Sequence, residues 1–260
     1  MADKMIKKSE VAARIQVLAQ SEKVENSDGK GDMVPRPDIS NAVIRRLPRY
    51  FRFLRELIRA QIFRISSSEL SKLMNVTASQ IRQDLNCFGG FGQQGYGYNV
   101  NYLYTKICEI LGVGEAFQAI IIGAGNLGRA FANNTMFNKR GIDVIASFDI
   151  NPLLIGTTYN NIPIYDISEL EEFCKNNNVD IVVLCVPKVA ATEVAEKINS
   201  IGIDAIWNFT GKELENVDPN TAIESVYLGD SLMTLCYDLC RKREADAKLA
   251  ADKLSEKENK

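Results

Sequence analysis

The chain has 260 residues, of which 46% are hydrophobic, and a formal net charge of −2 at pH 7. A chain of this length can bury one or two hydrophobic cores, and no apolar run approaches the roughly 18 residues that a membrane span needs, so we expect a soluble protein. Histidine is absent, which excludes Ser-His-Asp and Cys-His nucleophiles, His-based metal motifs and the imidazole proton relay of many nicotinamide dehydrogenases. We therefore expect no catalytic residue and no metal site.

Six cysteines are scattered along the chain, and no two form a C-x-x-C pair. The N-terminal segment also has no apolar stretch typical of a secretory signal. This pattern is typical of buried free thiols in a reducing compartment, so we expect a cytoplasmic protein. A disulfide framework is the alternative, because six is an even number, but a chain of this size does not need one.

Positive charge is concentrated in one part of the chain. Residues 36–106 contain eleven Lys and Arg against four Asp and Glu, a net charge of +7, which leaves −9 for the remaining residues. Such an asymmetry favours a domain that meets a polyanion, and a solvated basic helix face is the alternative. We expect the polyanion to be DNA, and the domain that binds it to span residues 36–112, after a flexible extension over residues 1–35.

The first helix of the basic domain is predicted over about residues 41–61. Its apolar residues recur every three or four positions, at Val43, Leu47, Phe51, Leu54 and Ile58. Pro48 lies within this pattern and predicts either a break or the first turn of a new helix.

Two short helices follow, each opened by a capping box, Ser66-x-x-Glu69 and Thr77-x-x-Gln80. The segment 74–76 is the turn between them. Two helices joined by such a turn in a basic region predict a helix-turn-helix.

The second helix has side chains suited to reading bases. Ile81 and Leu85 face inward, and this leaves polar side chains on the outer, N-terminal part, where Gln can pair with adenine and Arg with guanine. A pairing of Arg82 with a nearby carboxylate or with a DNA phosphate is the alternative. Base contacts are assigned to Ser79, Gln80 and Arg82, phosphate contacts to Arg46 and Lys72, and a further DNA contact to Ser67.

The glycine-rich stretch FGGFGQQGYGYN predicts a β-hairpin wing after the two helices, so the domain is a winged helix. DNA contacts in the wing are assigned to Gln93, Gln94, Gly95 and Tyr96. A helix over residues 100–111 closes the domain. Tyr102 and Lys106 have the Tyr-x-x-x-Lys spacing of short-chain reductases but precede the nucleotide loop, so we interpret them as ordinary helix positions.

The stretch IIIGAGNLGRAF, residues 120–131, is an apolar strand that runs into G-x-G-x-x-G and then a helix. Gly123 permits a tight turn, Gly125 lets backbone N–H groups approach phosphates, and Gly128 lets the helix pack closely on its strand. The pyrophosphate of a dinucleotide would lie at the positive end of this helix. An ordinary turn with packing glycines is the alternative. The predicted site contains Gly123, Ala124, Gly125, Asn126, Leu127 and Gly128.

A second apolar run ends in Asp149, twenty-one residues past Gly128. An acid at this position accepts hydrogen bonds from the adenosine ribose and repels a 2′-phosphate, which favours NAD over NADP.

Strands and helices alternate beyond residue 118, which predicts a doubly wound parallel sheet, a Rossmann domain, over residues 113–226. Ligands bind at the carboxyl edge of such a sheet, so the site also includes Val186, Pro187, Asn208 and Phe209. Strands are predicted near 119–123, 144–149, 162–164, 180–186 and 203–207, and helices near 126–138, 168–176 and 189–200.

After a strand-like AIESVYL, the C-terminal segment has apolar residues at Leu232, Leu235 and Leu239 and then many charges. This predicts a helix over residues 227–245 that buries one stripe, followed by a charged, solvated tail over 246–260. The spacing leaves open whether the stripe packs on its own domain or on a partner subunit.

The chain resembles the Rex family of NADH-responsive transcriptional repressors. The resemblance spans about residues 40–240 and is carried by RRLPRYFRFLREL, ISSSEL, TASQIRQDLNCFGGFGQQGYGYNV, IIGAGNLG, FDINP, CVP and WNF. It implies an α/β protein that forms a homodimer, with an N-terminal winged helix, a Rossmann domain and a C-terminal domain-swapped helix. It also implies that the dimer binds palindromic operator DNA with NAD⁺ or no ligand, and that NADH closes the Rossmann domains and releases the DNA.

The resemblance further implies that Tyr98 contributes to the cofactor pocket and to contacts that change between states, and that Arg52 lies between the DNA-binding domain and the swapped helix. Three positions depart from the family pattern. Tyr227 replaces an acidic partner of Tyr98 and Arg52, the proline that usually follows the Asn-Phe segment is missing after Phe209, and the wing has Gln93-Gln94 in place of basic residues. Fewer basic residues in the wing lower the expected salt dependence of DNA binding.

Two other functions remain open on the residues. An NAD-dependent oxidoreductase with a basic N-terminal module is one alternative, against which the missing histidine and the misplaced Tyr-x-x-x-Lys argue. A DNA-binding paralogue whose Rossmann domain no longer responds to NADH is the other, which Tyr227 and the lost proline keep open.

Overall fold

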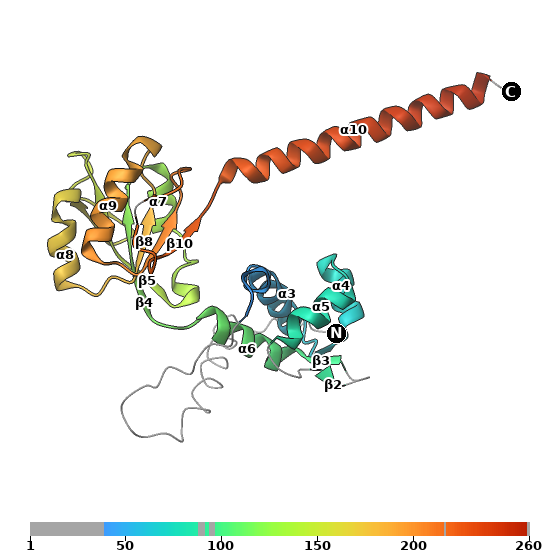
Figure 1. Ribbon diagram of the computed structural model, residues 1–260, viewed down its shortest axis with the longest axis horizontal. Coiled ribbons are helices and arrows are strands. Elements are labelled where there is room, and N and C mark those ends of the chain that lie inside the picture. The colour runs from blue at the N-terminus through green and yellow to red at the C-terminus, as the bar shows by residue number, and fades with distance from the viewer. Residues whose placement is uncertain (1–38, 88–91, 94–96, 216, 259–260) are drawn as a thin grey trace, which may run out of the picture.

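The computed structural model describes residues 39–87, 92–93, 97–215 and 217–258. An N-terminal, mainly helical domain is followed by an α/β domain and a long C-terminal helix (Figure 1). Each of the two domains has a hydrophobic core of its own. Within the described residues, no helix is both long enough and apolar enough to cross a membrane.

The predicted helix over 41–61 is interrupted at Arg45 and Arg46. It forms α2 (Asn41–Ile44) and α3 (Leu47–Arg59). Pro48 lies in the first turn of α3, where its missing N–H is not needed by the helix, so the break at this proline is confirmed.

The helix-turn-helix consists of α4 (Ser67–Met74) and α5 (Ala78–Asn86). The turn passes through Asn75, whose φ of 49° is left-handed and ends α4. The capping box of α4 is complete, because Ser66 and Glu69 exchange both hydrogen bonds. The second predicted capping box, at Thr77 and Gln80, is only half formed, so this prediction is wrong in part. Thr77 accepts from the Gln80 backbone N–H, but the Gln80 side chain bonds Asp84 instead of returning to Thr77.

The wing contains β2 (Gly92–Gln93) and β3 (Gly97–Asn99), and β1 (Arg64–Ile65) completes a three-stranded antiparallel sheet in the order β1-β3-β2. Gln94, Gly95 and Tyr96 lie outside the described residues. The helix α6 (Val100–Leu111) follows and packs on α3. Tyr102 and Lys106 are positions on α6, where Lys106 pairs with Glu109, and this agrees with their interpretation as helix residues.

The second domain is a seven-stranded sheet in the order β10-β9-β8-β4-β5-β7-β6, parallel except for β6. The chain runs from β4 to one side and then crosses to β8 on the other, so the topological switch point lies between β4 and β8. The strands are β4 (Phe117–Ile122), β5 (Ile142–Asp149), β6 (Thr158–Tyr159), β7 (Ile162–Asp166), β8 (Ile181–Leu184), β9 (Ala205–Asn208) and β10 (Ala222–Ser225).

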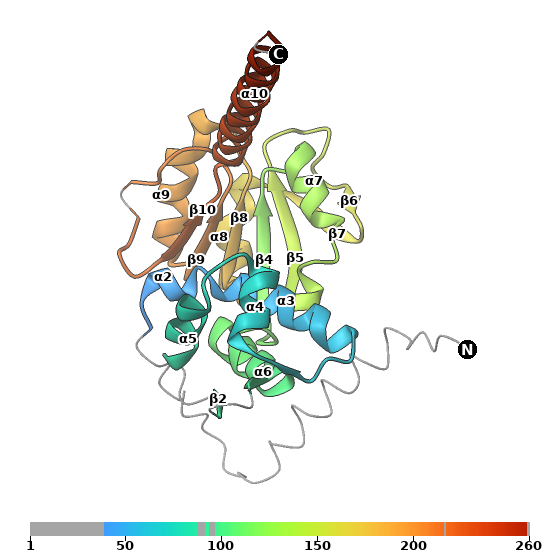
Figure 2. The same cartoon turned by 90° about the vertical axis from the view of Figure 1, so that its right-hand side faces the viewer.

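Helices cover both faces of this sheet (Figure 2). One face packs Ile120, Val182 and Leu184 against α8 and α9, and the other packs Ile121 and Val183 against α7. The helices are α7 (Asn126–Ala132), η1 (Asn138–Arg140), η2 (Ile167–Glu169), α8 (Leu170–Asn176), η3 (Lys188–Ala190) and α9 (Ala191–Ile201).

Two local details differ from the sequence expectation. The helix predicted over 126–138 ends at Ala132, because Asn134 Oδ1 accepts from the Met136 N–H and starts a turn that competes with the helix. The unpredicted strand β6 pairs with β7 through a two-residue turn at Asn160 and Asn161, which both have positive φ.

The C-terminal helix α10 (Leu228–Glu258) leaves the Rossmann domain and points away from both domains (Figure 1). It continues past residue 245, where the charged tail was expected to begin, and its strong helix formers Ala, Lys, Leu and Glu explain the extension. All six cysteines are free, as expected, but Cys87, Cys236 and Cys240 are exposed rather than buried.

Candidate dinucleotide site and nucleic-acid interface

The loop between β4 and α7 has the backbone geometry of a dinucleotide site. Gly123 has a φ of +100°, and a Cβ there would lie 2.7 Å from the Cys185 carbonyl oxygen. A Cβ on Gly128 would lie 2.0 Å from the Gly123 carbonyl oxygen. By contrast, a Cβ on Gly125 would meet no atom within 4 Å. Two of the glycines are therefore required by the fold, and Gly125 leaves open space at the N-terminus of α7 for a ligand.

Asp149 connects this loop to the end of β5. Its Oδ2 accepts from the Ala124 backbone N–H at 2.7 Å, and its Oδ1 accepts from the Asn151 N–H at 2.8 Å. A carboxylate has about four acceptor positions, so two remain for the hydroxyls of a ribose. Asp149 thus keeps the acceptor capacity that its predicted contact with a ribose requires.

Other predicted cofactor residues surround the same edge. Asn126 is exposed at the first residue of α7, and Leu127 is half-buried. Val186 is half-buried and Pro187 exposed after β8, beside the Gly123 turn. Burial raises the pKa of the Cys185 thiol to about 12, so this thiol is protonated and unreactive at neutral pH.

Asn208 has a structural role at the end of β9. It is only 1% exposed. Its Nδ2 donates to the Lys212 carbonyl and to Ser225 Oγ, and its Oδ1 accepts from the backbone and hydroxyl of Thr210. Because Asn208 has protein partners on both sides of its amide, we revise its expected role from ligand contact to support of the following turn. Thr210, which makes these bonds, is the residue directly after Phe209, where the resemblance implies a proline.

Phe209 belongs to an aromatic cluster on the α7 face of the sheet. Its ring centroid lies 4.7 Å from that of Phe131 and 4.6 Å from that of Trp207, and Phe137 completes the cluster. The cluster provides an apolar wall at the carboxyl end of β9.

Two apolar residues at the carboxyl edge were missed from the sequence. Ile150 directly follows Asp149 and is 78% exposed, and Val189 follows the β8 turn and is 93% exposed. Exposed apolar side chains on the loops after β5 and β8 suit the two faces of an adenine ring. The signal in the sequence for Ile150 was an apolar residue directly after the acid that ends β5, in FDI, whereas Val189 lies five residues past the end of β8 and carried no such signal.

Tyr98 lies in the N-terminal domain and not on the Rossmann sheet. It lies in β3 of the wing sheet, is 7% exposed, and packs in the core of the DNA-binding domain with Ile65 and Leu85. In the single chain the ring is buried in this core, and the expectation that Tyr98 lines the cofactor pocket stays a prediction.

The helix-turn-helix presents several of its predicted DNA contacts to solvent. Lys72, Ser79 and Arg82 are exposed. Arg82 Nη1 donates to Ser67 Oγ at 3.2 Å, which brings these two predicted contacts together across α4 and α5. In the wing, Gln93 lies in β2.

Arg46 is not a free cation. Its guanidinium forms a two-point ion pair with Asp84 of α5, with Nε–Oδ2 and Nη2–Oδ1 distances of 2.8 and 2.7 Å. Asp84 lies two residues from Arg82 on α5, yet it pairs with Arg46, and Arg82 bonds Ser67. The expected phosphate contact of Arg46 competes with this pair.

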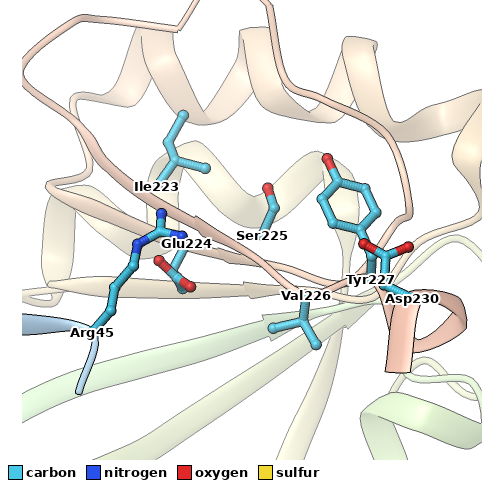
Figure 3. A pocket seen from close by; sticks show the side chains of 7 residues that line it. All are labelled: Arg45, Ile223, Glu224, Ser225, Val226, Tyr227 and Asp230. Carbon is cyan, nitrogen blue, oxygen red and sulfur yellow. The ribbon is translucent and has the colours of Figure 1, made fainter. Parts of the chain in front are cut away.

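A cavity of about 560 Å³ lies between the N-terminal domain and the start of α10 (Figure 3). Arg45 of the N-terminal domain points toward Glu224, and Tyr227 and Asp230 line the other end of the cavity. The resemblance had placed Arg52 between the two parts, but Arg52 is exposed and does not line this cavity. The cation that shares the cavity with Tyr227 is Arg45, which sequence reasoning missed.

Family models match both domains. A model described as "Putative DNA-binding protein N-terminus" matches residues 38–86, and one described as "CoA binding domain" matches residues 115–211. A helix-turn-helix and a nucleotide-type loop on one chain are the two parts that a ligand-responsive DNA-binding regulator needs, one for the DNA and one for the ligand.

Curated relatives identify the family within this class. The chain is 53% identical over 201 residues to a redox-sensing transcriptional repressor Rex from Caldanaerobacter subterraneus subsp. tengcongensis, covering 77% of this chain and 89% of the relative. It belongs to the Rex family of redox-sensing transcriptional repressors. A Rex from Clostridium botulinum is 52% identical over 206 residues, covering 79% of this chain and 98% of the relative. These relatives are repressors and not enzymes, so the expectation of a regulator is confirmed and the oxidoreductase alternative is wrong.

Solved structures agree with this assignment. A crystal structure of RSP in complex with beta-NAD⁺ and operator DNA matches with a TM-score of 0.74 and 50% identity, covering 82% of this chain and 97% of that chain. A crystal structure of RSP in complex with beta-NADH matches with a TM-score of 0.74 and 48% identity, covering 82% and 99%. The predicted combination of a winged helix and a Rossmann domain is confirmed.

Proposed function

We propose that this protein represses transcription by binding a palindromic operator as a homodimer, and that NADH releases it from the DNA. The observation that carries the proposal is the open space at Gly125 beside Asp149, on the same chain as a capped helix-turn-helix with exposed Arg82. RSP, whose match covers 82% of this chain, has been crystallised with NAD⁺ and operator DNA and with NADH.

Asp149 favours NAD(H) over related nucleotides. NADP carries a 2′-phosphate and coenzyme A a 3′-phosphate on the adenosine ribose, and either phosphate would lie near the Asp149 carboxylate. Like charges at this distance repel, whereas free ribose hydroxyls donate to the two remaining acceptor positions. The same residue therefore disfavours the ligand named in the CoA binding domain model.

Discrimination between NADH and NAD⁺ follows from the charge of the nicotinamide ring. The aromatic cluster of Phe131, Trp207 and Phe209 provides apolar surface on the Rossmann domain. Burying a cation against apolar groups costs more free energy than burying the neutral reduced ring. A closed form that encloses the ring would therefore bind NADH more tightly than the open, DNA-binding form does.

The C-terminal helix supplies the dimer contact in this proposal. Leu228, Leu232, Leu235 and Leu239 recur at intervals of four, three and four residues, so they lie on one face of α10. All four are exposed, and α10 points away from its own domains (Figure 1). A second copy of the chain that receives this stripe by helix exchange would bury it and would place two recognition helices for two half-sites.

The remaining assignments rest on this dimer. Ser79, Gln80 and Arg82 would contact bases, and Lys72, Ser67 and the wing would hold the DNA backbone. We place the protein in the cytoplasm, where the chromosome and the NAD(H) pool are both accessible. The cavity lined by Tyr227 also contains Arg45 of the N-terminal domain, so a change in the arrangement of the two domains would alter it. The resemblance implies an acidic residue at the position of Tyr227.

Thermodynamic linkage provides the test. If NADH weakens operator binding by a given factor, the operator must weaken NADH binding by the same factor. NADH affinity would be measured by calorimetry with and without saturating operator duplex, and operator affinity with and without saturating NADH. Equal factors greater than one support the proposal. Factors of one in both directions would leave a DNA-binding protein without a redox response.

A further inference from the structure

A buried carboxylate lies at the centre of the DNA-binding domain. Asp84 is on the recognition helix α5, yet it is 0% exposed. Its Oδ1 accepts from Arg46 Nη2 at 2.7 Å and from Gln80 Nε2 at 2.8 Å. Its Oδ2 accepts from Arg46 Nε at 2.8 Å and from the Tyr50 hydroxyl at 3.0 Å. Each oxygen thus accepts two hydrogen bonds, so the acceptor capacity of this carboxylate is filled.

These bonds connect three parts of the domain. Tyr50 lies on α3, Arg46 lies just before α3, and Gln80 lies one turn before Asp84 on α5. Burial alone would raise the pKa of Asp84, but hydrogen bonds from Arg46, Gln80 and Tyr50 outweigh burial and lower it. A charged carboxylate is retained in the core, and its partners become fixed relative to it.

We infer that Asp84 positions the recognition helix and the Gln80 amide for base reading, and that Arg46 binds Asp84 and not a DNA phosphate. The inference rests on the proposed DNA-binding function. It replaces the sequence-based assignment of Arg46 to the phosphate backbone.

The chemistry of the Gln80 contact sets its orientation. An ionised carboxylate only accepts hydrogen bonds, so the Nε2 end of the amide must face Asp84. One Nε2 hydrogen and the Oε1 oxygen remain available. This is the donor and acceptor pair that recognises N7 and N6 of adenine in the major groove. Asp84 thus fixes the Gln80 amide, already in the free protein, in the orientation that an adenine contact requires.

Arg46 is matched to Asp84 by shape as well as by charge. The planar guanidinium meets both carboxylate oxygens, which the point charge of a lysine cannot do. The two charges neutralise each other within α5 and the start of α3. Removing Arg46 should therefore disturb base recognition without removing a cation from the DNA backbone.

Two substitutions at one position separate these roles, Arg46→Lys and Arg46→Gln. Affinity for an operator duplex and for an unrelated duplex would be measured by fluorescence anisotropy across a range of salt concentrations. We expect Arg46→Lys to lower the ratio of operator to unrelated affinity by at least about fivefold, the lower end of a bidentate base contact. We expect both variants to keep the wild-type dependence of log affinity on log salt.

A phosphate contact would behave differently. Arg46→Lys would then bind operator as the wild type does, and Arg46→Gln would weaken both duplexes alike while reducing the salt slope by about one. That result would overturn the inference and leave the proposed function standing. Wild-type protein that fails to prefer operator would overturn the proposed function, and the inference with it.

Tyr50→Phe and Asp84→Asn extend the test. Tyr50→Phe keeps the core ring and removes only one bond to Asp84, so it serves if the Arg46 variants unfold, and it should lower the same ratio with the salt slope unchanged. Asp84→Asn can donate as well as accept, so the Gln80 amide loses its imposed orientation. Affinity would be measured for operators in which each adenine is substituted in turn. At one base position, the substitution should weaken binding less in Asp84→Asn than in the wild type. Undiminished discrimination at every position, or an unchanged ratio in Tyr50→Phe, would contradict the positioning role.

Discussion

Two glycines of the nucleotide loop are expected to respond in opposite ways to substitution. A Cβ on Gly128 would lie 2.0 Å from the Gly123 carbonyl oxygen, which cannot move without displacing the turn. A Cβ on Gly125 would meet no atom within 4 Å. Gly128→Ala should therefore destabilise the fold, and Gly125→Val should leave the fold intact while filling the space of the pyrophosphate.

The magnitudes follow from the two environments. Overpacking of this kind costs about 1–3 kcal/mol. At about 2–4 °C per kcal/mol, the Tm of Gly128→Ala should fall by about 2–12 °C. For Gly125→Val, a surface change of about 0.5 kcal/mol or less implies a Tm within about 2 °C of wild type.

Ligand-dependent stabilisation distinguishes the binding defect. A ligand at a hundred times its Kd stabilises a protein by about 2.7 kcal/mol, a Tm increase of about 5–11 °C. Differential scanning fluorimetry should show this increase for the wild type with NADH and none for Gly125→Val. An unchanged increase in Gly125→Val would refute the placement of the pyrophosphate, and an unchanged Tm of Gly128→Ala without ligand would refute the steric argument.

Four further results are expected. Arg82→Ala should weaken operator binding by about 1–3 kcal/mol and relax specificity at one base pair, and equal operator affinity in anisotropy would contradict the assignment. Asp149→Asn should narrow the preference for NADH over NADPH in calorimetric titrations. The pKa of Asp84 lies below its ordinary value of 3.8, so the stability that its charged form contributes is present above pH 3.8 and is lost as the pH falls through the folded-state pKa. The Tm of Asp84→Asn should therefore fall less steeply below pH 4 than the Tm of the wild type. Leu235→Asp should yield monomers in light scattering, and a persistent dimer would exclude the α10 stripe as the contact.

Features set by local chemistry could be predicted from the sequence. Pro48 marked the break between α2 and α3, and the Ser66 capping box marked the start of α4. The G-x-G-x-x-G spacing located a loop in which Gly123 and Gly128 admit no side chain. Each of these signals acts within a few residues of itself, so no tertiary contact is needed to read it.

Features set by distant partners could not be predicted in this way. Asp84 lies on the same short helix as Arg82, and only the tertiary fold, which brings the start of α3 to α5, shows that Arg46 binds it. Asn208 ends its strand as a ligand residue would, yet the turn after β9 uses its whole amide. Tyr98 was placed by resemblance, and its burial in the wing sheet depends on pairing with β1.

The most direct measurement of the central claim is the anisotropy of a labelled palindromic operator bound to the full chain at a fixed salt concentration, titrated separately with NADH and NAD⁺. The account predicts that NADH releases the DNA and that NAD⁺ at the same concentrations does not. Tight binding that neither nucleotide changes would contradict it.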